Sequence, residues 1–155
     1  MKPVFKRRPD RRLAKLIRLP GGRTIEDIEA DVEARLEALH DVCLAGVHER
    51  LQEILTLAAA MPRPPRPEDL QRLYDLSNAV IGQSGVAGLE DLGRAALSFC
   101  QLLDAWRSGR RWSAASFDVH LNALKLMSQA DGALDAAGRA AVLEGLNRVA
   151  RRAAG

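Results

Sequence analysis

Apolar residues recur at every third or fourth position through most of the chain, which is the spacing of one face of an α-helix. The clearest run extends from Ile25 to Leu57 and predicts one long amphipathic helix that ends near Ala60. Thr24 is the expected N-cap, because Asp27 follows it at the spacing of a capping box. We therefore expect this helix to begin directly after Thr24.

The length of this predicted helix constrains the architecture. It would extend about 55 Å at the usual rise per residue, which is more than a compact helical bundle needs. Either one end overhangs the bundle, or the helix bends near Ala45 and Gly46, or it pairs with a second copy of the chain. A homodimer built on this apolar stripe is therefore one alternative for the assembly.

Proline, glycine and serine divide the rest of the chain into further helical segments. The proline-rich residues 61–67 are expected to form an extended linker. Apolar spacing predicts four more helices: from Pro67 to Gly82 or beyond, from near Leu89 to around Arg107, from Ser113 or Ser116 to Asp131, and from Asp135 to a basic last turn at Arg148, Arg151 and Arg152. A short basic helix is also expected within residues 11–19, before the glycines at 21 and 22 stop it.

The composition favours an all-α fold. The 155 residues are 47% apolar and 28% charged but only 4% aromatic, and the alternation typical of strands is scarce. No apolar run approaches the roughly 18 residues that span a bilayer, and the N-terminus lacks the apolar region of a secretory signal. Cys43 and Cys100 each lie on an apolar stripe, so we expect reduced core cysteines, with a disulfide as the alternative. The expected protein is cytoplasmic and has no membrane span.

The net charge of +3 hides an asymmetry along the chain. Residues 1–18 carry eight lysines and arginines against Asp10 alone, and the long helix that follows opens with acidic residues, as the helix dipole favours. The basic segment can dock on its own bundle, on a partner protein, or on a membrane surface or nucleic acid. Because only Phe5 supplies an aromatic anchor, we expect no nucleic-acid partner. We divide the chain into a basic N-terminal extension, residues 1–22, and a helical bundle, residues 23–155.

The polar side of the segment from Leu70 to Gly85 is unusual for a helix. On a helical projection one side carries the apolar residues Leu73, Leu76 and Val80. The other side carries Gln71, Tyr74, Asp75, Asn78, Gly82 and Gly85. A glycine inside a helix costs about 1 kcal/mol relative to alanine. These two glycines therefore indicate either the close approach of another backbone or a loop that begins at Gly82.

The sequence N-A-V-I-G-Q-S-G-V-A-G at residues 78–88 resembles the signature of histidine-phosphotransfer (HPt) domains, H-x-[LIV]-K-G-x-[SA]-x-x-[LFA]-G. Four residues match the signature in type and spacing: Val80, Gly82, Ser84 and Gly88. The apolar residues of 92–103 resemble the helix that closes the hairpin in that family. Asn78 stands in place of the phospho-accepting histidine, and Ile81 in place of the usual lysine. A carboxamide cannot form a phosphoramidate as a neutral imidazole can.

The last third of the chain carries a second resemblance. The segments SFDVHLNALKLM and VLEGLNRVARR are similar to the C-terminal part of bacterial chemotaxis accessory proteins of the CheE type. Together the two resemblances imply an HPt-like, four-helix up-and-down bundle with an extra N-terminal basic helix. They also imply a non-catalytic adaptor of a chemotaxis or other two-component pathway, whose partner is a CheY-like receiver domain of a response regulator or a histidine kinase. The partner-binding residues would be Gln71, Tyr74, Asp75, Asn78, Ile81, Gly82 and Gly85.

Two histidines offer an alternative function, that of an active phosphotransfer protein. Such an acceptor has to be exposed and to have small neighbours. His48 lies beside Ala45 and Gly46, and His120 is expected to face outward from its helix. A dimeric helical scaffold is the third reading of the chain.

Other classes of site lack the residues that they require. His40 and Cys43 are close on one helix, but no second cluster completes the roughly four ligands of a zinc site. The glycines of 82–88 have no G-K-[ST] sequence and no preceding strand for a nucleotide phosphate. The carboxylates of Glu90 and Asp91 point to different faces of a helix and do not converge as acid–base partners. We therefore expect no metal site, no cofactor and no enzymatic activity.

Overall fold

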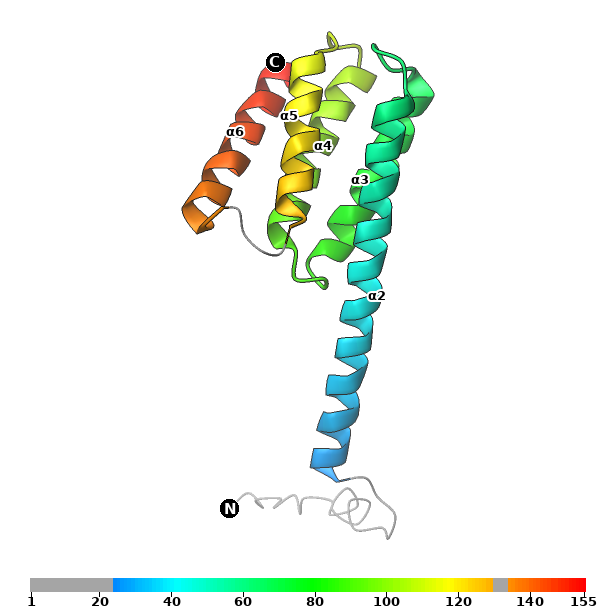
Figure 1. The fold of residues 1–155 in the computed structure, drawn as a ribbon, viewed down its shortest axis with the longest axis vertical. Helices are drawn as coiled ribbons and strands as arrows, with labels where there is room; N and C mark the ends of the chain where they lie inside the picture. Colours follow the sequence, from blue (N-terminus) through cyan, green and yellow to red (C-terminus); the bar gives the residue numbers. More distant parts are fainter. Residues whose placement is uncertain (1–23, 130–133) are drawn as a thin grey trace, which may run out of the picture. The chain divides into compact units, whose positions relative to one another are not determined.

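The computed structural model of the chain describes residues 24–129 and 134–155. These residues form five α-helices and no strand: α2 (Ile25–Ala60), α3 (Pro67–Ser84), α4 (Glu90–Arg107), α5 (Ala114–Met127) and α6 (Ala136–Ala154) (Figure 1). The predicted all-α fold is confirmed. The predicted helix within residues 11–19 lies outside the described residues. The prediction that the fourth helix continues to Asp131 is wrong, because α5 ends at Met127 with Ser128 as its C-cap.

Local capping explains where most of these helices begin. The Thr24 backbone N–H donates to Asp27 Oδ2 at 3.0 Å, and the Asp27 N–H donates to Thr24 Oγ1 at 3.1 Å, so the predicted capping box is confirmed. Helix α3 begins with Pro67, as expected of a residue that has no N–H to satisfy. Of the two serines predicted to begin α5, Ser113 is the N-cap, because its Oγ accepts from the Ser116 N–H at 3.2 Å. Asp135 caps α6 in the same way.

The chain divides into two compact units, residues 1–36 and 37–155, with the boundary inside α2. Helix α2 is one continuous helix of 36 residues, as its apolar spacing predicts. In the described part of the first unit the large apolar side chains are exposed by 48–71%: Ile25, Ile28, Val32 and Leu36. In the second unit the same helix buries Cys43, Val47, Leu51, Ile54 and Ala58. The predicted stripe therefore belongs to the core only from Cys43 onward.

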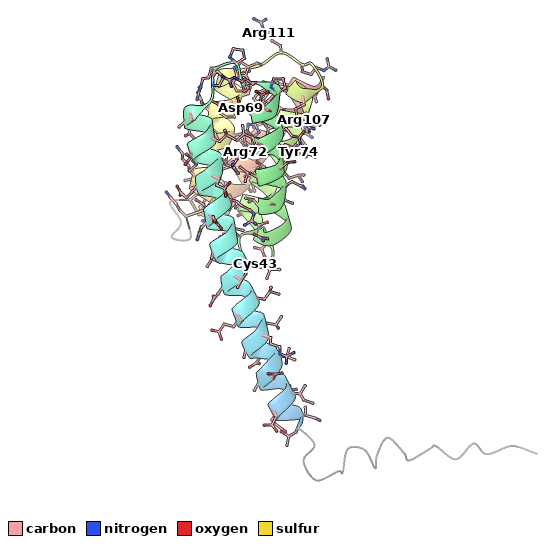
Figure 2. The ribbon with its side chains drawn as sticks, turned by 90° about the vertical axis from the view of Figure 1, so that its right-hand side faces the viewer. Cys43, Asp69, Arg72, Tyr74, Arg107 and Arg111 are labelled. Carbon is pink, nitrogen blue, oxygen red and sulfur yellow. The ribbon has the colours of Figure 1, made fainter. Side chains whose placement is uncertain are left out.

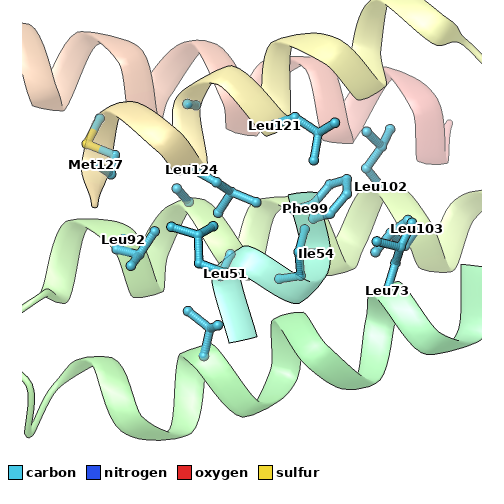
Figure 3. Close-up of a cluster of buried hydrophobic side chains, with 14 of the residues drawn as sticks. Leu51, Ile54, Leu73, Leu92, Phe99, Leu102, Leu103, Leu121, Leu124 and Met127 are labelled. Atoms are coloured by element: carbon cyan, nitrogen blue, oxygen red, sulfur yellow. The ribbon is translucent and has the colours of Figure 1, made fainter. Parts of the chain in front are cut away.

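Helix α4 is the centre of the second unit, because it packs against α3, α5 and α6. Successive helices run in alternating directions from α2 to α6 (Figure 1). The core close-up shows Leu51 and Ile54 of α2 lying among side chains of α3, α4 and α5 (Figure 3). The labelled partners are Leu73, Leu92, Phe99, Leu102, Leu103, Leu121, Leu124 and Met127, all of which are buried.

A glycine allows α4 to begin very close to the end of α3. A Cβ atom built at Gly93 would overlap Ser84 Oγ and lie 3.1 Å from Ser84 Cβ. Both residues are buried. The connection is equally tight, because the Leu89 N–H donates to Ser84 O at 2.8 Å and Gly88 adopts a φ of +68° that favours glycine. Gly93 is therefore a requirement of the α3–α4 packing.

Candidate functional site

The predicted partner-binding residues lie on one face of α3 and at its C-terminal end. Five of them are exposed: Gln71, Asp75, Asn78, Gly82 and Gly85. Tyr74 and Ile81 are partly buried at the edge of the core. The opposite face of α3 is buried through Leu73, Ser77, Val80 and Ser84. We call the seven exposed and partly buried residues the α3 face.

Packing among the described residues does not explain the two glycines of the α3 face. Gly82 lies inside α3, which continues to Ser84, so no loop begins at Gly82. Gly85 follows directly as the C-cap and has helical dihedral angles. A Cβ atom at either glycine would meet no atom within 4 Å, and neither has a positive φ. The backbone is therefore accessible here although an alanine would fit.

The α3 face is electrically neutral at its glycine-containing end. No charged residue lies between Asp75 and Glu90, a stretch that includes the whole second half of the face. Val86, in the turn that follows the face, is 46% exposed. Asn78 contributes a carboxamide that both donates and accepts hydrogen bonds. The surface thus offers apolar contact and one neutral polar group beside open backbone.

A polar network joins the other end of the α3 face to α4. The Arg107 guanidinium lies 4.7 Å from the centroid of the Tyr74 ring, and its Nη2 donates to Gln71 Oε1 at 2.6 Å (Figure 2). Gln71 Nε2 in turn donates to Asp75 Oδ1 at 2.8 Å. Arg107 also forms an ion pair with Asp104, with Nη1 and Oδ1 3.4 Å apart. Three of the predicted residues are thus brought together by an arginine that sequence reasoning missed.

The thiol of Cys100 lies behind this network. Its Sγ is 3.8 Å from the Tyr74 backbone carbonyl, to which it donates. Burial raises the pKa of Cys100 to about 11. Cys43 is also buried, and both cysteines are free, as predicted. The Cys100 side chain is therefore a neutral core group and no nucleophile.

No family model, curated protein or solved structure matches the chain. The resemblances to HPt domains and to CheE-type proteins therefore depend on the residues of the chain alone. The site has to be argued from its geometry and chemistry.

The prediction that His120 faces outward is wrong. Its side chain is fully buried against Phe99, with ring centroids 5.9 Å apart. His120 Nδ1 is 2.8 Å from Ser116 O, which can only accept, so Nδ1 carries the proton and Nε2 accepts from the Ser98 hydroxyl at 3.1 Å. Burial lowers the pKa of His120 and keeps the imidazole neutral. Helix α5 packs against both α4 and α6, so its buried arc is wider than one stripe and includes His120.

His48 is exposed, as a phospho-acceptor has to be. Its neighbour Gly46 is not an open approach, because a Cβ there would lie 2.8 Å from Gln83 Oε1 and 3.0 Å from Arg50 Nη1. The ends of the Gln83 and Arg50 side chains therefore cover this position. His48 is therefore exposed, but the backbone beside it is not open as it is at Gly82 and Gly85.

Within residues 24–129 and 134–155, no three His, Cys, Asp or Glu side chains gather as metal ligands. Over the same residues, no helix is both long enough and apolar enough to cross a membrane.

Proposed function

We propose that residues 37–155 form an HPt-like, up-and-down bundle that binds the receiver domain of a response regulator through the α3 face. The protein acts as an adaptor in a two-component or chemotaxis pathway and accepts no phosphate at Asn78. The observation that carries the proposal is the open space at Gly82 and Gly85, one and two turns along the helix from Asn78. Helical glycines that nothing in the described part of the chain requires are explained by the close approach of a partner.

The chemistry of the α3 face fits binding without group transfer. Asn78 has no nucleophilic nitrogen lone pair, so it can hydrogen-bond near a receiver's aspartate pocket but cannot take its phosphoryl group. Ile81 and Val86 add apolar contact to the neutral surface. An adaptor of this kind sequesters or localises the regulator. Because the glycine-containing end of the α3 face carries no charge, we expect its affinity to change little between about 50 and 300 mM salt.

The test introduces a bulky side chain at the open glycine of the α3 face. Gly82→Arg is expected to lower the affinity for the partner receiver domain by at least about tenfold, since the side chain would occupy the space of the partner backbone. Gly145→Arg is the matched control, because Gly145 is another helical glycine whose Cβ would meet nothing within 4 Å, on α6.

The measurement is calorimetric titration of the full chain against each purified receiver domain of the source organism. A receiver domain that binds the wild type and Gly145→Arg but not Gly82→Arg supports the proposal. Equal affinities for all three proteins, or binding to no receiver domain, would remove it. Circular dichroism on the same samples shows whether both variants keep their helices.

Phosphotransfer through His48 is a second candidate, which the exposure of His48 favours. Incubation with a phosphorylated receiver domain would then place an acid-labile label on this protein. Loss of that label in His48→Gln, together with an unlabelled Asn78, would establish an active phosphotransfer protein. If the label is absent in the wild type, this candidate is excluded.

A dimeric scaffold is the third candidate, which the exposed apolar side chains of the first unit favour. Ile28, Val32 and Leu36 recur on one side of α2 and are each about half exposed or more. Light scattering over a concentration series would show a dimer directly, and Val32→Asp would be expected to dissociate it. A monomer at all concentrations would exclude this candidate.

A further inference from the structure

A cavity of about 410 Å³ lies where the loop after α2 meets the end of α4. Its lining includes a proline wall, Pro64, Pro65 and Pro67, and an aromatic wall, Trp106 and Trp112. The volume is within the range of small-molecule sites, which is roughly 300–1,000 Å³. Proline and indole surfaces in one cavity are suited to a planar, apolar ring.

Arginines supply the charge of this cavity. Arg107 and Arg110 are among its lining residues, and none of the lining residues is acidic. Arg107 is already held by Gln71 and by the Tyr74 ring. For the Arg110 guanidinium the described residues provide neither an ion pair nor a hydrogen bond. The cavity therefore combines an apolar slot with an uncompensated cation, which favours an anion.

The backbone at the end of α4 holds Arg110 in this place. Its N–H donates to Ala105 O at 3.0 Å, and Gly109 before it adopts a φ of +89°. A positive φ of this size favours glycine. The backbone position of Arg110 beside the cavity is thus a property of the helix end.

Trp106 forms the buried part of the aromatic wall. It is only 6% exposed, and its indole Nε1 has no acceptor among the described residues. Buried donors without a partner are rare in native proteins and destabilising. Trp112 lies against it with ring centroids 4.3 Å apart, and Phe117 supports Trp112 from behind at 5.1 Å. The aromatic wall is therefore backed by further aromatic packing.

We propose that this cavity binds a small aromatic anion, an aryl phosphate or aryl carboxylate. Its ring lies between the proline wall and Trp112, and its charged group is bound by Arg110, with Arg107 beside it. The inference does not depend on the adaptor function, although Gln71 of the α3 face is also among the lining residues. A bare inorganic anion would leave the aromatic wall unused, and a neutral ring would leave Arg110 unpaired.

The tryptophans provide a direct assay, since the only two in the chain both line this cavity. The full chain is titrated with phenyl phosphate while tryptophan fluorescence and the two indole N–H signals in NMR spectra are followed. Inorganic phosphate supplies the charge without the ring, and benzyl alcohol the ring without the charge. We expect a saturable response to phenyl phosphate and at least about tenfold weaker binding of the other two.

Two variants separate the cavity from general basicity. Arg110→Gln is expected to weaken phenyl phosphate binding by at least about tenfold. Arg111→Gln removes the adjacent arginine, which is exposed and does not line the cavity, and should bind as the wild type does. The proposal is overturned if phenyl phosphate gives no saturable response up to about 10 mM, which is weaker than ordinary specific binding. It is equally overturned if both variants bind alike or if inorganic phosphate binds as well as phenyl phosphate.

Discussion

The two faces of α3 use small residues in opposite ways. On the buried face, Ser84 approaches Gly93 of α4 so closely that no Cβ fits at residue 93. On the exposed face, Gly82 and Gly85 have more room than an alanine needs. The sequence contains the same residue type in both places, but only at Gly93 does the fold itself account for it.

The difference separates packing from function. A glycine that a neighbouring element requires should be costly to replace. A glycine with open space around it weakens its helix by about 1 kcal/mol at most. It makes no packing contact that offsets this cost. Replacing each in turn therefore measures which glycines belong to the fold and which to the surface.

The largest effect is expected for Gly93→Leu. The new side chain would have to displace the end of α3 near Ser84, and overpacking of this kind lowers the free energy of unfolding by about 3 kcal/mol. Chemical denaturation followed by circular dichroism measures the loss. Gly82→Leu is the matched control and should unfold within about 1 kcal/mol of the wild type. Equal losses for the two variants would show that the two faces do not differ.

A smaller effect is expected for Gly93→Ala, and it should depend on Ser84. The single methyl group meets Ser84 Oγ, so we expect a loss of about 1–2 kcal/mol in the free energy of unfolding. Ser84→Ala removes that oxygen, which otherwise donates to Ile81 O at 3.1 Å. In the double variant the loss at Gly93 should shrink by about 1 kcal/mol. Simple additivity would contradict a direct contact between the two residues.

Local signals explain the part of the fold that could be predicted. The start of α2 at Thr24, the start of α3 at Pro67 and the cap at Asp135 depend on residues within one helical turn. The apolar spacing of α2 likewise predicts a helix ending at Ala60 without knowledge of its partners. Neither signal depends on long-range contacts, which is why both could be found in the sequence.

The rest depends on residues that are distant in sequence. The contact of Arg107 with Gln71 spans 36 positions, and no pattern around either residue indicates it. The sequence around His120 predicts an outward side chain, whereas Ser98 and Phe99 of α4 contact it and bury it. The exposure of Asn78 agrees with its place on the polar side of the projection, but the space at Gly82 could only be seen once α4 was placed.

The free energy of unfolding should also depend on pH through the buried His120. Because burial lowers its pKa in the folded protein, the unfolded chain takes up a proton first as the pH falls below the ordinary histidine value of about 6.5. The stability contributed by neutral His120 is therefore present above that value and is lost as the pH falls toward the lowered pKa. In His120→Gln, which can still hydrogen-bond to Ser98 and Ser116, denaturation at about pH 7 and pH 5.5 should show a smaller difference than in the wild type. An identical pH dependence would mean that other groups cause it.

The smallest change, and the one that decides the comparison, is Gly82→Ala. Because the added methyl meets nothing within 4 Å, it should raise the free energy of unfolding by up to about 1 kcal/mol. The same methyl would lie between the α3 backbone and any partner that packs against it, so receiver-domain affinity should fall even as stability rises. Glu144→Ala, an exposed substitution on α6, controls for a general gain in helix propensity. If Gly82→Ala is more stable and binds its receiver domain with unchanged affinity, the glycine is not required for the close approach of a partner. The main reason for proposing the α3 face as a binding surface would then be removed.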